Sequence, residues 1–382
     1  MVVAGTELAA QSVYPADRPM ASYAQQWLSE LHRYSSATKK RVYTLFGDSS
    51  EGYKVLICRY LTPQEPPSMI TTRRGCLHFA SMIPFMPDSQ AFVGEIDLWC
   101  TTKQTLEMGA GDEEEHGVSL FNFLSYLQKQ SSNNGVDNGR FTLNAAGYPS
   151  SEQIATETLF FVIGRAVPEG NSCYVLLRKS LPGGISNRYG PENYILANPC
   201  TGYVYSASDR DCPLIDIACL ATSYNIWANI QNEGKPNTLN YDVLNTKCWK
   251  PFFGSRYPFP KLGLLTVQER VEYVPTSSMI CVQVEKEVRG SIKSSFRKWR
   301  AKRSRSVTTF HPDACSIVSD HLHLLEEWKV TGDIANLEAE PGSGFSNKKP
   351  KGILTLSKSK SVRIGAHGIP EHILSLLQTE IK

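Results

Sequence analysis

The strongest hydrophobic pattern in the chain lies at residues 108–127, where the sequence reads MGAGDEEEHGVSLFNFLSYL. Small or apolar residues recur there at helical spacing and predict one buried stripe: Gly117, Leu120, Phe121, Leu124 and Leu127. Asp112 is placed to cap this helix, and Glu115, three residues later, completes a capping box. Three consecutive glutamates, 113–115, also place negative charge at the positive end of the helix dipole. We therefore predict a central helix over residues 112–127.

Strand patterns dominate after this helix. Residues 158–164 (TLFFVIG) form a continuous apolar run, which is typical of a strand buried on both faces. Shorter strand patterns follow at 173–178, 194–198, 203–206, 215–220 and 225–231. This succession predicts an α+β domain in which the central helix packs on a mostly antiparallel sheet.

Five further elements are predicted before the central helix. Residues 23–33 favour a short helix, and two strand patterns at 40–46 and 53–60 flank a polar turn, which predicts a hairpin. Apolar residues at helical spacing predict a helix over 70–83, and another short helix begins near Thr101.

Toward the C-terminus the pattern becomes helical again. From Cys281 an apolar line recurs at helical spacing: Val284, Val288, Ile292, Phe296 and Trp299. A second helix is expected over 313–329 and a terminal helix over 370–381, whereas residues 241–260, rich in aromatic residues and proline, are expected to be irregular.

These patterns divide the chain into five segments. They are a disordered lead (1–22), a hairpin and helix segment (23–92), a core (93–260) with a polar insertion at 130–153, a helical extension (261–330) and a largely disordered tail (331–382). We expect the tail to be a truncated domain end that leaves a sheet edge or an apolar patch uncovered.

Composition narrows the function classes only slightly. The 382 residues are 41% hydrophobic and carry a net charge of +3, which supports a core and selects no class of partner. No stretch of 18 apolar residues occurs and the N-terminus lacks the pattern of a signal peptide, so we predict neither a membrane span nor secretion. Ten scattered cysteines without a CxxC pair favour a reducing, cytoplasmic setting.

Three stretches carry a resemblance to a known family. They are IPFMPDSQAFVGEIDLWCTTKQTLEMGAGDEEEHGVSLFNFL (83–124), YILANPCTGYVYSASDRDCPLIDIACLATSYNIWANIQ (194–231) and CWKPFF with the following RYPFP (248–260). Together they resemble the C-terminal region of the coiled-coil and C2 domain-containing protein 2A family, whose members are scaffolds of the ciliary transition zone. The coiled coils and the C2 domain of that family are absent, so the chain resembles a fragment, a short paralogue or a partial gene model.

The resemblance implies a degenerate papain- or transglutaminase-like domain with a helical C-terminal extension. An active site of that type needs a cysteine at a helix start, a histidine on a strand and an orienting Asp or Asn. The matching positions here are Glu113, Ser172 and Asn198, of which only Asn198 is compatible with catalysis. We therefore expect an inactive pseudoenzyme with no cofactor and no small-molecule substrate. An active cysteine protease or transglutaminase with a rearranged Cys–His dyad is the alternative, drawing on Cys200, Cys212 or Cys219.

Two groups of residues raise the question of a metal. His116 lies beside Glu113, and a second cluster contains His311, Cys315, His321 and His323. The second cluster does not have a standard zinc spacing, and a histidine near a charged helix start is more often solvated. We expect no metal at either place and predict that His116 is a surface residue.

A basic run follows the predicted apolar line. Between residues 286 and 305 it includes six candidate binding residues: Lys293, Arg297, Lys298, Arg300, Lys302 and Arg303. The simplest interpretation is a helix packed on the domain with a solvated basic face. The alternatives are an acidic protein partner, anionic lipid headgroups or an acidic microtubule surface. Nucleic acid is not expected, because no recognition motif accompanies the charge.

Pattern and resemblance together predict a non-catalytic scaffold of the ciliary transition zone or basal body that contributes to cilium assembly. Its expected location is the cytoplasm at the base of the cilium, and its expected partners are other transition-zone proteins.

Overall fold

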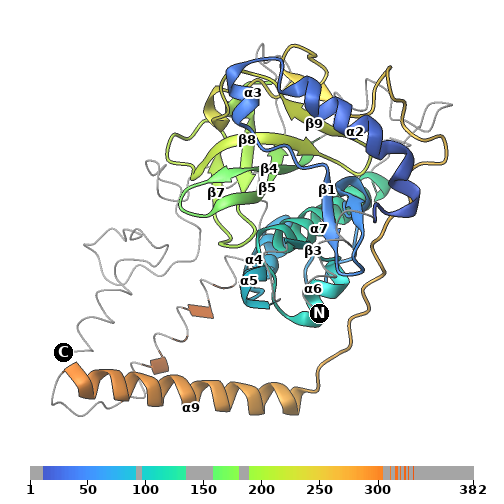
Figure 1. Ribbon diagram of the computed structural model, residues 1–382. Helices are drawn as coiled ribbons and strands as arrows, with labels where there is room; N and C mark the ends of the chain where they lie inside the picture. Colours follow the sequence, from blue (N-terminus) through green and yellow to red (C-terminus); the bar gives the residue numbers. More distant parts are fainter. Residues whose placement is uncertain are drawn as a thin grey trace, which may run out of the picture. The chain divides into compact units, whose positions relative to one another are not determined.

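Figure 1 shows the computed structural model of the chain. It describes residues 12–91, 97–134, 158–179 and 189–303, together with isolated residues between 310 and 330. The chain divides into two compact units. The first runs from the N-terminus to Val271 with short later segments, and the second begins at Glu272. No described helix is both long enough and apolar enough to cross a membrane.

The first unit is built around a large antiparallel sheet. Its strands, in spatial order, are β10 (Trp249–Pro251), β9 (Ile226–Asn229), β8 (Leu214–Ala221), β4 (Leu159–Ala166), β5 (Gly170–Arg178), β6 (Tyr194–Ala197) and β7 (Val204–Ser206). Every neighbouring pair in this sheet is antiparallel. A smaller sheet contains β2 (Lys54–Leu56), β1 (Phe46–Ser49) and β3 (Leu98–Trp99), with β1 antiparallel to β2 and parallel to β3. The predicted α+β class and the antiparallel sheet are confirmed.

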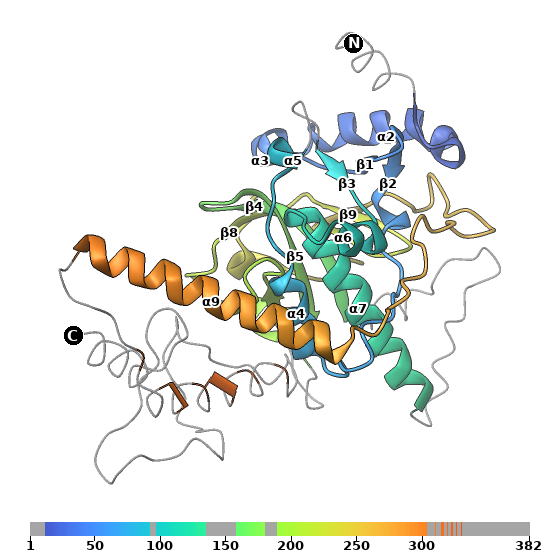
Figure 2. The same ribbon diagram turned by 90° about the horizontal axis from the view of Figure 1, so that it is seen from below.

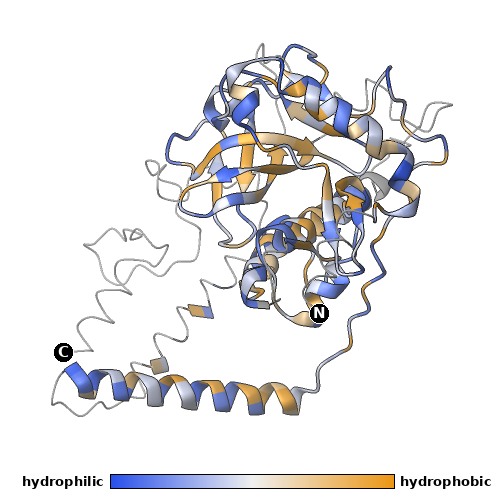
Figure 3. Cartoon of the chain, viewed as in Figure 1, coloured by the Kyte–Doolittle hydropathy of each residue, from blue (hydrophilic) through white to orange (hydrophobic). Residues whose placement is uncertain are grey.

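Helices surround these sheets. The α-helices of the first unit are α2 (Arg18–Leu31), α3 (Ser36–Lys40), α4 (Arg73–Met82), α5 (Asp88–Ala91), α6 (Thr102–Met108) and α7 (Glu113–Asn134). Single 3-10 turns are η1 (Pro15–Asp17), η2 (Ile57–Arg59), η3 (Pro191–Asn193) and η4 (Pro236–Thr238). The second unit contains α9 (Ser278–Arg303). Figure 3 shows that apolar residues concentrate in the strands of the large sheet, whereas the helices show mixed polarity.

The central helix α7 packs directly on β4 and β5, and Figure 2 shows α4 and α6 beside it. A Cβ atom added to Gly117 would lie 2.9 Å from the Cβ of Cys173 and 2.9 Å from Cε2 of Phe161, so only glycine allows this approach. Asp112 caps the helix as predicted, and the bond from Glu115 back to Asp112 is present, but the Asp112 side chain accepts from residue 114 instead of residue 115, so the capping box is incomplete. The Asp112 carboxylate accepts from the Glu114 N–H at 3.3 Å, and Glu115 Oε2 accepts from the Asp112 N–H at 3.1 Å.

The prediction of a disordered lead over 1–22 is wrong from residue 12 onward. Asp17 is fully buried, where its carboxylate accepts from the Leu56 N–H at 2.9 Å and from Arg59 Nε at 2.9 Å. The following helix buries Met20 and Trp27, and so begins at Arg18 rather than at residue 23. Residues 1–11 lie outside the described part of the chain.

Other boundaries also differ from the prediction. The predicted hairpin is confirmed, but its strands are shorter and shifted: β1 begins only at Phe46, after α3 and an extended segment, and β2 ends at Leu56, where η2 follows. Ser35 caps α3 in a capping box with Thr38. Residues 261–271 belong to the first unit rather than to the helical extension, since Arg59 donates to the Leu265 carbonyl at 2.7 Å. The stretch 241–260 is mostly irregular, as predicted, but it contains β10, which pairs with β9.

Several predicted features fall outside the described residues. The polar insertion at 130–153 is described only to residue 134, where it continues α7, and the helix expected at 313–329 is described only at isolated positions. The tail at 331–382, with its terminal helix, is not described. The expectation of a truncated domain end therefore stays a prediction.

Candidate functional site

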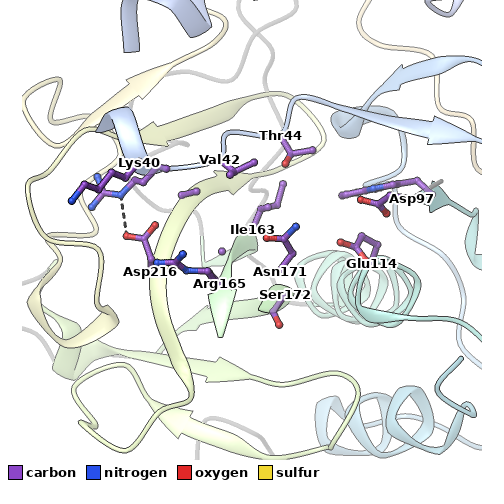
Figure 4. Close-up of a pocket in the computed structure, with 14 residues that line it drawn as sticks. Lys40, Val42, Thr44, Asp97, Glu114, Ile163, Arg165, Asn171, Ser172 and Asp216 are labelled. Atoms are coloured by element: carbon purple, nitrogen blue, oxygen red, sulfur yellow. Dashed lines mark hydrogen bonds and ion pairs between the residues drawn. The ribbon is translucent and has the colours of Figure 1, made fainter. Parts of the chain in front are cut away.

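A small cavity lies at the start of α7, against β4, β5 and β8 (Figure 4). The extended segment 40–44 and the strand β3 complete its wall. Its volume is about 60 Å³, which is room for only a few water molecules. Six charged side chains line it: Lys40, Arg41, Asp97, Glu114, Arg165 and Asp216.

Strand alternation decides which side chains of β5 face α7. Cys173 faces the helix, because it lies against Gly117. The β4–β5 ladder is regular over the whole of β5, so residue 171 shares this face while residues 172 and 174 point to the other. Figure 4 shows Asn171 and Ser172 leaving the strand in opposite directions. Asn171 therefore faces the cavity together with Glu114.

The three positions expected for a degenerate catalytic triad do not bring their side chains together. Glu113 lies at the first turn of α7, but Ser172 points away from that helix. The Ser172 hydroxyl is buried and has no hydrogen-bond partner among the described residues. Asn198 donates to the Tyr174 hydroxyl at 2.9 Å and accepts from the Cys200 N–H at 3.0 Å. Its side chain therefore holds the turn after β6.

Residue alignment by motif thus misses the cavity by one position on the helix and omits one residue on the strand. Glu114, rather than Glu113, lines the cavity from the helix, and Asn171 lines it from β5 together with Ser172. The spacing of the motif gives no signal of this offset, because the contact between Gly117 and Cys173 decides which face of each element turns inward.

Carboxyl groups cluster at the start of α7. Side-chain oxygens of Asp88, Asp97 and Asp112 lie within 4.8 Å of one another, and so do those of Asp112, Glu113 and Glu114. Burial, with a smaller contribution from the neighbouring Asp112 carboxylate, raises the pKa of Glu113 to about 7. Burial also raises the pKa of Glu114 well above its usual range. Burial therefore favours the protonated form of the Glu113 and Glu114 carboxyl groups, whereas the sequence suggested that they are ionised at the helix start.

These oxygens are the described groups that could ligate a hard cation such as Ca²⁺ or Mg²⁺. Hydrogen bonds within the helix start already use part of this set, since the Asp112 and Glu115 carboxylates both accept from backbone N–H groups. Glu115 also accepts from the Cys100 N–H at 2.8 Å. The cluster is accordingly an integral part of the way α7 begins.

The prediction that His116 is a solvated surface residue is wrong. The side chain is fully buried, and its ring nitrogens contact two backbone carbonyls. Nδ1 lies 2.6 Å from the Asp112 oxygen and Nε2 lies 2.9 Å from the Ile83 oxygen. Because a carbonyl oxygen can only accept, both contacts are satisfied together when the ring carries both protons. His116 thus ties the start of α7 to the end of α4. The second histidine cluster cannot be placed, because His311 and His321 lie outside the described residues.

The opposite end of the cavity is closed by an ion pair that the sequence gave no reason to expect. Arg41 Nε lies 3.0 Å from an Asp216 carboxylate oxygen, and Arg41 Nη1 donates to the Asn229 carbonyl at 3.0 Å. These partners are 175 and 188 residues distant in sequence. The guanidinium is therefore a structural group that joins the segment before β1 to β8 and β9.

All ten cysteines are free thiols, and none lines the cavity. Burial raises the pKa of Cys212 and of Cys219 to about 12. Burial also raises the pKa of Cys173 and Cys200, and carboxylates raise both further, including Glu114. These thiols are protonated near neutral pH, which is typical of structural cysteines.

The predicted basic residues all lie on α9 in the second unit. Its packing on the first unit stays a prediction. The sequence prediction of a continuous basic helix is confirmed.

Comparison with known proteins adds family information to this geometry. Residues 154–252 match a family model described as CEP76 peptidase-like domain. The chain is 24% identical to protein CC2D2B from Homo sapiens over 273 residues, which are 69% of this chain and 16% of that protein. It is 22% identical to the coiled-coil and C2 domain-containing protein 2A from Drosophila melanogaster over 262 residues, 67% of this chain and 16% of that protein. The match thus spans about a sixth of each relative, and it confirms the predicted resemblance to this family.

Proposed function

We propose that this chain is a non-catalytic interaction module of a protein assembly at the base of the cilium, where it contributes to cilium assembly. The similarity to the coiled-coil and C2 domain-containing protein 2A family supports the setting. The cavity at the start of α7 supports the absence of catalysis. Under this proposal the chain acts through its surfaces, with other transition-zone proteins as partners, and requires neither a substrate nor a cofactor.

The observation that carries the proposal is the chemistry of the cavity lining. A cysteine peptidase or transglutaminase holds its thiolate at a helix start, opposite a histidine that takes the proton. Here Glu114 lines the cavity from the helix start, Asn171 and Ser172 line it from β5, and the lining contains neither cysteine nor histidine among the described residues. An amide has no basic nitrogen, a serine cannot act as a general base at neutral pH, and a buried, protonated carboxyl is a poor nucleophile, so these groups cannot carry out acyl transfer.

The size of the cavity supports the same conclusion. Substrate sites are clefts of several hundred cubic ångströms, whereas this cavity has a volume of about 60 Å³. Arg41 and Asp216 close one end, and the ring of Trp99 contributes to the lining. A peptide segment cannot enter without displacement of these side chains.

The alternative is an active cysteine peptidase or transglutaminase with displaced catalytic residues. Its support is the match of residues 154–252 to a peptidase-like family model. This alternative requires a thiol that ionises near neutral pH. Cys200 is disfavoured for this role, because Glu113 and Glu114 raise the pKa of its thiol beyond the effect of burial.

Thiol labelling with iodoacetamide at pH 7, read by mass spectrometry on the folded full-length chain, tests catalysis. We expect no thiol of the first unit to react faster than a simple alkyl thiol. The positive control combines Glu114→Cys with Asn171→His, which places a thiol and an imidazole on the same cavity. The matched control combines Glu113→Cys with Ser172→His, because residue 113 does not line the cavity and the side chain at 172 leaves β5 in the direction opposite to Asn171.

Only the first pair should give a thiol whose labelling is accelerated at pH 6–7, where an ordinary thiol is still protonated. A native cysteine that reacts at least tenfold faster than a simple thiol, and loses that rate on substitution of a nearby histidine, would favour the enzyme instead.

Localisation in ciliated cells tests the second part of the proposal. The chain fused to a fluorescent protein should concentrate at the base of the cilium, and Glu114→Gln should localise equally because no chemistry is needed. Gly117→Leu should lose localisation, because its side chain would meet Cys173 and Phe161 and displace α7 from the sheet. A diffuse signal equal to that of the fluorescent protein alone would contradict the proposal.

A further inference from the structure

The C-terminal half of α9 carries an unusual concentration of positive charge. Residues 291–303 contain six basic side chains and no acidic one: Lys293, Arg297, Lys298, Arg300, Lys302 and Arg303. The preceding half, 278–290, contains two acidic and two basic residues and is therefore neutral. Within that half the Glu285 carboxylate pairs with Arg289 one turn later. The charge is thus confined to the last thirteen residues of the helix.

Apolar side chains share one face of the same segment. At 3.6 residues per turn, Ile292, Phe296 and Trp299 fall within about 60° of one another around the helix axis. Ile292 is 63% exposed and Trp299 is 48% exposed, so this face presents apolar surface to its surroundings. The rings of Phe296 and Trp299 lie 5.7 Å apart between centroids and form a continuous aromatic patch.

Basic residues border this face on both sides. By helical position Lys293 and Arg300 lie along one border, and Lys298 and Lys302 lie along the other. Long basic side chains at such borders can extend their charges away from an apolar layer. The guanidinium carbon of Arg303 lies 5.0 Å from the Trp299 ring centroid, which places a cation at the end of the aromatic patch.

This arrangement matches a lipid surface better than a second helix. A coiled coil needs apolar residues at alternating spacings of three and four residues, but a heptad repeat extended from Val284 and Val288 places serines at 291 and 295. Two copies of this segment would also bring six positive charges against six. An anionic bilayer supplies both the negative charge and the apolar layer.

We infer that the C-terminal half of α9 lies in the headgroup region of an anionic lipid bilayer. Ile292, Phe296 and Trp299 enter the boundary of the acyl chains, while the bordering lysines and arginines bind the anionic headgroups. The neutral half of the helix contributes little to the attachment. This inference is independent of the catalytic state of the first unit.

Co-sedimentation with vesicles tests the inference on the full 382-residue chain. We expect binding to vesicles of 70% phosphatidylcholine and 30% phosphatidylserine at least tenfold tighter than to phosphatidylcholine alone. Each basic residue near such a surface contributes about a factor of five, so Lys298→Gln with Lys302→Gln should weaken binding by roughly tenfold or more. Raising the salt concentration from 0.1 M to 0.5 M should also weaken it, because added ions screen the charges.

Two matched pairs of substitutions separate the apolar from the electrostatic contribution. Phe296→Ala with Trp299→Ala should weaken binding at least tenfold, since two apolar rings leave the bilayer. Val284→Ala with Val288→Ala removes exposed apolar groups from the neutral half and should change binding less than threefold. Phe296→Leu with Trp299→Leu should retain most of the binding, which would show that apolar surface is required.

Three results would overturn the inference. They are equal binding to neutral and anionic vesicles, unchanged binding after removal of both rings, and preferential capture of nucleic acid that does not depend on the rings. Urea unfolding of each variant, followed by tryptophan fluorescence, should match that of the parent chain, because these side chains are outside the core of the first unit.

Discussion

The carboxyl cluster at the start of α7 predicts that the protein is more stable in mild acid than at slightly alkaline pH. Burial raises the pKa of Glu113 from 4.5 to about 7, and it raises the pKa of Asp97 from 3.8 to about 6. The folded state therefore binds a proton more tightly than the unfolded state between these values. The stabilisation of the folded state by this bound proton is complete below the pKa of the unfolded state. It is lost as the pH rises through the pKa of the folded state.

The magnitude follows from the shift of Glu113, because one pKa unit corresponds to about 1.4 kcal/mol. The shift from 4.5 to about 7 sets an upper limit of roughly 3 kcal/mol on the loss above pH 7. The side chain is only partly buried, so water screens its charge and we expect about 1–2 kcal/mol. Asp112, Glu169 and Asp97 act in the same direction, since each adds negative charge near Glu113.

Glu113→Gln isolates this effect, because an amide keeps the size of the carboxyl and cannot ionise. At pH 8 the variant should be more stable than the parent by about 1–2 kcal/mol, and near pH 4 the difference should vanish. Urea unfolding followed by tryptophan fluorescence measures both values, with a chelator present and ionic strength fixed. Glu107→Gln, an exposed change on the neighbouring α6, should have an effect within about 0.5 kcal/mol at either pH.

A loss of stability in Glu113→Gln at pH 8 would refute this reasoning. It would show that the ionised carboxylate is stabilised at the helix start by the dipole and the backbone N–H groups, and that burial is the weaker effect.

Two further predictions concern the packing of the first unit. Asp17→Ala should lower the free energy of unfolding by about 3–5 kcal/mol, because Arg59 would remain buried without its counter-ion. The control Asp48→Ala breaks the exposed pair with Lys54 and should lower it by less than about 1 kcal/mol. If urea unfolding showed similar losses of stability for these two variants, the docking of the N-terminal segment through Asp17 would be contradicted. Gly117→Ala should lower the free energy of unfolding by about 1–3 kcal/mol, because the added methyl group overpacks the contact with β4 and β5. The control Gly290→Ala meets open space, so it should leave stability unchanged or raise the helix content slightly, as measured by circular dichroism.

Local signals in the sequence predicted most elements of the first unit. The strand β4 follows from an uninterrupted apolar run, and α7 follows from a capping-box pattern and an apolar repeat, all within a few residues. Asp17 was misjudged because its partner, Arg59, lies 42 residues later and no local pattern connects them. The buried position of His116 likewise depends on the carbonyl of Ile83, 33 residues earlier.

The candidate site was predicted only in part for a related reason. The resemblance identified the correct helix start and the correct strand, but it assigned Glu113 where Glu114 lines the cavity, and it omitted Asn171, which lines the cavity beside Ser172. Because side chains alternate along a strand, a shift of one residue places the side chain on the opposite face of the sheet. Which face turns inward depends on how closely α7 approaches β5, and this is a tertiary property that the motif does not encode.

The guanidinium of Arg59 joins both ends of the first unit. It pairs with Asp17 near the beginning of this unit, and it donates to the carbonyl of Leu265 near its end. Entry and exit of the polypeptide therefore lie at neighbouring points. A unit with this geometry can be inserted between other domains of a long polypeptide without separating them. Engineered fragments should respect the same junction: a truncation that removes Asp17 or Leu265 would leave the buried Arg59 without that partner, while flanking fusions at both ends should be tolerated.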